Sequence, residues 1–115
     1  MQVEWIKCGN GSNWCPLEMV NLDNVNTTGV YMIWHEGNPS RVVRLGQGNI
    51  KDRLGVHRKD TAVLAYRRHG LLRVTWASVA WSYLDGVEKY LANTWPPLIG
   101  DAFPDAPPIA VNSPW

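Results

Sequence analysis

Two apolar runs separated by a turn open the regular part of the chain. Residues 29–35 are rich in β-branched and aromatic side chains, and residues 36–40 contain the Gly, Asn and Pro that are typical of turns. A second run follows at 41–46. This pattern predicts a β-hairpin with a loop of about four or five residues.

Helical spacing follows the hairpin. Asn49 can cap a helix that runs to about Lys59. Within it, Ile50, Leu54 and His57 recur at i, i+4 and i+7, so they share one apolar side. The segment therefore predicts an amphipathic helix directly after the hairpin.

The second half of the chain alternates between helix and strand. Residues 61–69 predict a short helix that ends at Gly70, and the alternation over 72–76 predicts a third strand that can continue to Trp81. A third helix is expected over about 85–94. Its buried side is marked by Val87, Leu91 and Trp95.

The two ends of the chain carry little regular pattern. Residues 1–28 are rich in Gly and Asn and predict an irregular lead-in that packs on the core. From Pro96 onward, repeated prolines exclude regular structure, yet the apolar residues among them predict an ordered coil. The expected fold is α/β: a three-stranded antiparallel sheet flanked by helices, forming a single domain over residues 1–115.

Composition agrees with a small globular domain. The chain has 115 residues, of which 45% are hydrophobic and 18% are charged. No apolar run approaches the roughly 20 residues that a membrane-spanning helix needs. The N-terminus shows no basic region followed by an apolar stretch, so no secretory signal is expected. We therefore expect a soluble, cytoplasmic protein without a membrane partner.

Charge is divided unequally along the chain. Residues 41–73 hold nine basic and two acidic residues, a net charge of +7, whereas the remainder holds two basic and eight acidic residues, a net charge of −6. Such a basic segment favours a polyanionic partner, although acidic neighbours in space could also balance it. The nine bases are Arg41, Arg44, Lys51, Arg53, Arg58, Lys59, Arg67, Arg68 and Arg73.

The two cysteines leave three interpretations. Cys8 and Cys15 could close a small disulfide loop or supply half of a zinc site. Structural zinc usually requires a second ligand pair at short spacing, which this sequence lacks. Two buried free thiols are therefore the expectation.

Two triplets and a helix carry a resemblance to a known family. Gly-Val-Tyr stands at 29–31 in the first strand, and Arg-Leu-Gly stands at 44–46 in the second. The following helix has Arg53 and, four residues later, His57. Together these elements resemble the GIY-YIG nuclease family.

Two further residues extend the resemblance over about residues 29–112. Glu88 stands where the family has its metal-binding glutamate, and Asn112 matches the asparagine that closes the domain. The resemblance implies a metal-dependent DNA endonuclease that uses Mg²⁺, or Mn²⁺ in its place. Arg44 departs from the pattern, because the family has a tyrosine there whose hydroxyl helps to hold the attacking water.

The implied chemistry assigns a role to each matching residue. Glu88 supplies a hard oxygen ligand to the metal ion. Arg53 forks onto the phosphoryl oxygens, Tyr31 orients or deprotonates the water, and His57 relays a proton or binds phosphate. Nucleic-acid contacts are expected at Arg44, Lys51, Arg58, Lys59, Arg67, Arg68 and Asn112.

Each of these residues also has a structural interpretation. Glu88 and Asp85 could form a capping box, and Tyr31 could be a core aromatic residue. Arg53 and His57 could be border residues of an amphipathic helix. Gly46 and Gly48 could serve the turn alone. Trp34, Trp76 and Trp81 are expected to fill the core rather than to stack on bases.

Three functions remain to be separated. The first is a DNA endonuclease of low sequence specificity, for which a partner protein or a homodimer would supply base recognition. The second is a catalytically impaired nucleic-acid-binding domain of the same fold, which Arg44 motivates. The third is a small protein-interaction domain without a polyanionic partner.

Overall fold

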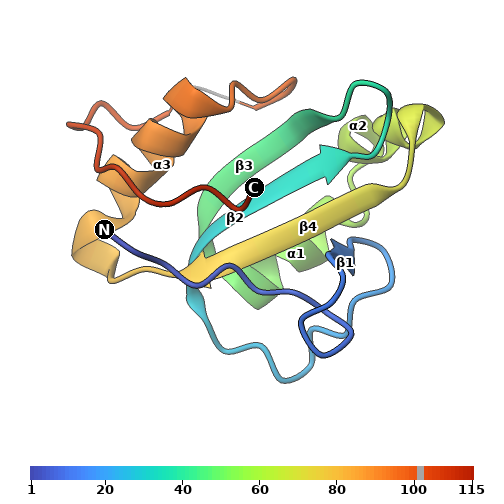
Figure 1. Ribbon diagram of the computed structural model, residues 1–115, viewed down its shortest axis with the longest axis horizontal. Coiled ribbons are helices and arrows are strands. Elements are labelled where there is room, and N and C mark those ends of the chain that lie inside the picture. The colour runs from blue at the N-terminus through green and yellow to red at the C-terminus, as the bar shows by residue number, and fades with distance from the viewer. Residues whose placement is uncertain (101–102) are drawn as a thin grey trace.

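A computed structural model describes residues 1–100 and 103–115. Its four strands form one antiparallel sheet in the order β1-β4-β2-β3 (Figure 1). The strands are β1 (Cys15–Pro16), β2 (Thr28–His35), β3 (Arg41–Asn49) and β4 (Leu72–Ser78). The helices are α1 (Ile50–His57), α2 (Thr61–Leu64), η1 (Ala65–His69), η2 (Trp81–Tyr83) and α3 (Leu84–Thr94).

The predicted α/β class is confirmed, but the sheet has one strand more than predicted. The added strand β1 pairs Cys15 with Val74 and Pro16 with Arg73 of β4. A strand of two residues that includes proline has no alternating pattern to reveal it, because its pairing depends on tertiary contacts. The expectation of three strands was therefore wrong.

The cysteines are joined rather than free. Cys8 and Cys15 form a disulfide that closes the loop leading into β1. The expectation of two free thiols was wrong. The cause is the turn between the cysteines, in which Cys8 N donates to Asn13 O at 2.7 Å and returns the chain toward Cys15.

Strand β4, which was predicted as the third strand, ends at Ser78 and does not continue to Trp81. Ser78 is the last residue of β4 to pair with β2, opposite Gly29, and the chain then enters η2. Trp81 lies in η2 and is 82% exposed, so the expectation that it fills the core was wrong. Trp34 and Trp76 are buried, as predicted.

Apolar layers cover both faces of the sheet, and both faces of β2 are therefore buried. Tyr31 and Ile33 pack with the layer that includes Leu54 of α1. Val30 and Met32 pack with the layer that includes α3 and the C-terminal coil. Figure 1 shows α1 and α3 on opposite sides of the sheet. No helix in the described part of the chain is long and apolar enough to cross a membrane.

The proline-rich coil after α3 is ordered in its described part, as predicted. It covers the edge of β3, where Leu98 N donates to Val42 O at 3.0 Å and Ile99 N donates to Val43 O at 2.9 Å. Ile109 N then donates to Gly86 O on α3 at 2.9 Å. The coil therefore forms part of the wall around anything bound at the β3 edge.

Candidate active-site cleft

A cleft of about 210 Å³ opens beside the edge strand β3. Four of the predicted site residues line it, and they come from β2, β3, α1 and α3: Tyr31, Arg44, Arg53 and Glu88. The remaining lining residues are Leu45, Gly46, Gln47, Gly100 and Phe103. The four predicted residues, which are up to 57 positions apart, thus share one small space.

Tyr31 reaches the cleft across its neighbouring strand. It pairs with Gly46 in the β2–β3 register, and its hydroxyl lies 2.6 Å from Nε2 of His57. Tyr31 is buried, with an exposed fraction of 1%. The core interpretation of Tyr31 is therefore correct for its ring, while its hydroxyl belongs to a polar pair at the wall of the cleft.

His57 is a neutral partner for that hydroxyl. Burial, together with the positive charges of Arg44 and Arg53 and against a smaller opposing effect of Asp60, lowers the pKa of His57 to about 4. Its Nδ1 has no hydrogen-bond partner within the described residues. The Nε2 atom of a neutral imidazole can accept a hydrogen bond from a phenol hydroxyl. The lone pairs of the phenol oxygen then remain free to accept a hydrogen bond from a water molecule.

Gln47 joins the two carboxylates of α3. Its Nε2 donates to Oε2 of Glu88 and to Oδ1 of Asp85, each at 2.8 Å. The N-cap residue of α3 is Tyr83, which makes no side-chain capping hydrogen bond, and Asp85 makes none either. The capping-box interpretation of Asp85 and Glu88 was therefore wrong, because both side chains face β3 instead of the helix backbone.

The carboxylate of Glu88 is largely shielded from solvent. It is 8% exposed, and burial raises its pKa. The bond from Gln47 lowers that pKa and the charge of Asp85 raises it. Gln47 was not among the predicted site residues, because an amide carries no charge and no motif. The one available signal is its position directly after the 44–46 triplet.

The cleft offers one mode of metal binding. No group of three or more His, Cys, Asp or Glu that could hold a metal ion occurs among residues 1–100 and 103–115. Mg²⁺, however, is commonly bound by one or two carboxylates with water in its other positions. Glu88 fits that mode, since it lines the cleft and has Arg53 and Arg44 beside it to hold a phosphate.

The two arginines of the cleft differ in their surroundings. Arg53 is exposed, and its aliphatic stem passes Gly48, whose φ of +132° is a conformation that favours glycine. Arg44 is half-buried, and its Nε has no hydrogen-bond partner within the described residues. Both guanidinium groups line the cleft, where they can fork onto an anion.

The other predicted nucleic-acid contacts lie outside the cleft. Arg58 donates to Val20 O at 2.8 Å, and Arg67 forms an exposed ion pair with Glu18 at 3.2 Å. Arg68 donates to Nε2 of His69. The basic segment is thus divided, because intramolecular acceptors already engage part of its charge.

Lys51, within α1, and Lys59, just after it, are exposed. Asn112 lies elsewhere: its Oδ1 accepts from Val3 N at 2.7 Å, and its Nδ2 donates to Val3 O at 3.0 Å. This asparagine fastens the N-terminal segment to the C-terminal coil and does not line the cleft with Glu88.

No protein-family model, curated protein or solved structure matches this chain. The functional argument therefore depends on the residues of the cleft and on their geometry.

Proposed function

We propose that the protein is a metal-dependent endonuclease that hydrolyses phosphodiester bonds of DNA with low sequence specificity. The observation that carries this proposal is the convergence of Tyr31, Arg53 and Glu88 on one cleft, with His57 bonded to the hydroxyl of Tyr31. Phosphodiester hydrolysis requires an oriented water, positive charge on the phosphoryl oxygens and stabilisation of the leaving oxygen. These side chains offer groups for each task.

The proposed reaction assigns one step to each group. The hydroxyl of Tyr31, with its proton directed to His57, orients a water for attack on phosphorus. The water adds to phosphorus as one of its protons passes through the Tyr31 hydroxyl to Nε2 of His57, the bond from phosphorus to the leaving oxygen breaks, and that oxygen takes a proton from solvent and departs as an alcohol. Arg53 and Arg44 fork onto the non-bridging oxygens, where negative charge develops. Glu88 would hold a Mg²⁺ or Mn²⁺ ion, which supplies Lewis-acid stabilisation of that charge.

Plasmid nicking tests this proposal. With Mg²⁺ present, the native protein should convert supercoiled plasmid to the open-circular form, and chelation with EDTA should stop it. Glu88→Gln retains the size of the side chain but removes its charge, so nicking should fall by at least about a hundredfold. Glu4→Gln, a change at an exposed glutamate outside the cleft, is the matched control. Nicking by Glu88→Gln at the native rate contradicts the proposal.

A second function is favoured by Arg44. Its side chain lines the cleft and can bind a phosphate there, but a guanidinium cannot act as a base or a metal ligand. The cleft would then hold nucleic acid without cleaving it. Salt-sensitive DNA binding that weakens in Arg44→Gln, together with absence of nicking in either Mg²⁺ or Mn²⁺, would favour this alternative.

A further inference from the structure

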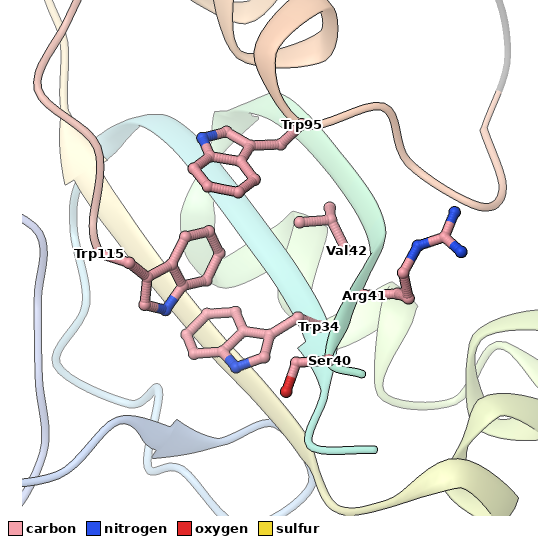
Figure 2. Close-up of a pocket in the computed structure, with 6 residues that line it drawn as sticks. All are labelled: Trp34, Ser40, Arg41, Val42, Trp95 and Trp115. Carbon is pink, nitrogen blue, oxygen red and sulfur yellow. The ribbon is translucent and has the colours of Figure 1, made fainter. Parts of the chain in front are cut away.

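A second cavity, of about 300 Å³, lies at the hairpin end of the sheet. Figure 2 shows the rings of Trp34, Trp95 and Trp115 and the side chain of Val42 around it. Trp115 meets the other two rings edge to face, with centroids 4.9 Å from Trp34 and 5.0 Å from Trp95. This volume is at the lower end of the range for small-molecule sites, and its lining suits a flat aromatic group.

Arg41 connects this cavity to two neighbouring hollows. In Figure 2 its guanidinium points away from the three rings and toward the coil after α3. A hollow of about 240 Å³ beside Pro96 shares Arg41 and Val42 with the cavity. A larger hollow of about 500 Å³ shares Arg41 and also includes Arg68 and His69. The apolar rings of the cavity therefore lie next to positively charged side chains.

The positive charge beside the cavity favours an anionic ligand over a cationic one. No Asp or Glu side chain of the described residues lines the cavity or the larger hollow. A quaternary ammonium ligand gains from indole faces, but here it would meet the positive charge of Arg41. A ligand with a flat ring and a phosphate is complementary to both parts, since indoles stack on any base and a guanidinium forks onto phosphate.

We propose that this site binds an unpaired nucleotide of single-stranded DNA, with its base among the three tryptophans and its phosphate on Arg41. The choice of a DNA strand rests on the proposed function, whereas the preference for a base with a phosphate rests on the cavity alone. Arg41 begins β3, and the active-site cleft uses residues 44–47 of the same strand. At about 3.3 Å per residue, Val42 and Gly46 lie about 13 Å apart, so a short stretch of single strand can reach both.

Binding of a labelled single strand tests the proposal without cleavage. The probe is an oligothymidylate of about 12 nucleotides, followed by fluorescence anisotropy in EDTA. Trp115→Ala removes a half-exposed ring of the cavity and should weaken binding by about 5- to 100-fold. Trp81→Ala removes a more exposed tryptophan outside the cavity and should leave affinity unchanged.

Arg41→Gln provides an independent measurement at an exposed position. It should weaken binding and reduce the slope of log affinity against log salt by about 0.7, the value for one phosphate contact on a single strand. Trp115→Ala should leave that slope unchanged. Lys7→Gln removes a positive charge outside these hollows and is the matched control.

The outcomes separate this site from the nuclease proposal. Native affinity in both Trp115→Ala and Arg41→Gln overturns the nucleotide site, whatever the nicking assay shows. Equal affinity for blunt duplex overturns the preference for an unpaired base, and equal competition by thymidine monophosphate overturns the assignment to a strand. Weakened single-strand binding in both variants, with no nicking by the native protein, supports the site and overturns the nuclease proposal.

Discussion

The hydroxyl of Tyr31 occupies the space that a side chain at residue 46 would fill. A Cβ placed on Gly46 would lie 2.5 Å from Oη and 2.8 Å from Cζ of Tyr31. Both distances are shorter than real Cβ contacts allow, so one of the two groups would have to move. The absence of a side chain at Gly46 is therefore what admits the hydroxyl to the cleft and to His57, and the turn alone does not account for this glycine.

Gly46→Ala should damage the cleft more than the fold. The added methyl group must displace the buried ring of Tyr31, which we expect to cost about 1–3 kcal/mol of the free energy of unfolding. Displacement of the Tyr31 hydroxyl from His57 should lower plasmid nicking on the order of a hundredfold. Urea denaturation and initial nicking rates measure the two effects separately.

Gly55→Ala is the matched control for this substitution. Gly55 lies inside α1, and a Cβ there would meet nothing within 4 Å. Alanine is favoured over glycine in a helix interior, so the free energy of unfolding should rise by about 0.5–1 kcal/mol with nicking unchanged. Nicking at the native rate in Gly46→Ala would show that the position of the Tyr31 hydroxyl is irrelevant to activity.

The lowered pKa of His57 predicts an acid-sensitive fold. Between the ordinary histidine pKa of 6.5 and the pKa of about 4 in the folded protein, the unfolded chain binds a proton that the folded chain does not. The free energy of unfolding should therefore fall as pH decreases through this window. Lowering the pH from about 7.5 to about 5 should remove about 2 kcal/mol through this residue.

The comparison of the native protein with His57→Gln isolates that effect. Burial raises the pKa of Glu88 and lowers the pKa of His35, so both groups also contribute to the pH dependence, with opposite signs. In the difference between the two proteins, to first order, only the contribution of His57 remains. Equal pH dependence of urea denaturation in both proteins would show that His57 titrates normally.

Sequence patterns predicted the elements that depend on residues close together in the chain. Asn49 was predicted to cap a helix, and its Oδ1 accepts from Asp52 N at 3.0 Å. The hairpin and the ordered coil also follow from their sequences. Strand β1 and the disulfide were missed, because pairing of two residues and closure of a loop depend on neighbours that a linear pattern does not contain.

The motif residues of the cleft were predicted from the sequence, whereas its amide was missed. The motif residues Tyr31, Arg53 and Glu88 do line one cleft. Gln47, which joins Glu88 to Asp85, has no charge to draw attention to it. Asn112 matches in residue type, but its side chain bonds to the backbone of Val3 and does not line the cleft.

The disulfide makes the first part of the chain sensitive to reductant. Its loop from Cys8 to Cys15 is short, so loop closure accounts for about 2 kcal/mol of the free energy of unfolding. Urea denaturation with and without dithiothreitol should differ by about that amount. The Cys8→Ser/Cys15→Ser variant should behave like the reduced protein and should show no further change with reductant. Equal stability of the oxidised and reduced native protein would contradict this expectation.

Under the proposed function, substitution of Arg53 should separate binding of DNA from its cleavage. Affinity for DNA is shared among many basic residues, whereas the charge that develops in hydrolysis is concentrated on one phosphate. Arg53→Ala should therefore lower nicking by about a hundred- to thousandfold and leave duplex affinity nearly intact. Because Arg53 is exposed and only its stem passes Gly48, the free energy of unfolding should change little.

Two further variants decide what Arg53 contributes. Arg53→Lys keeps the charge but loses the planar fork, so it should recover little of the nicking rate. Lys7→Ala removes an exposed positive charge outside the cleft, and its nicking rate should stay close to native. Full activity of Arg53→Lys would mean that a point charge near the phosphate suffices. Native nicking by Arg53→Ala would place the phosphate elsewhere, with Arg44 as the remaining guanidinium of the cleft.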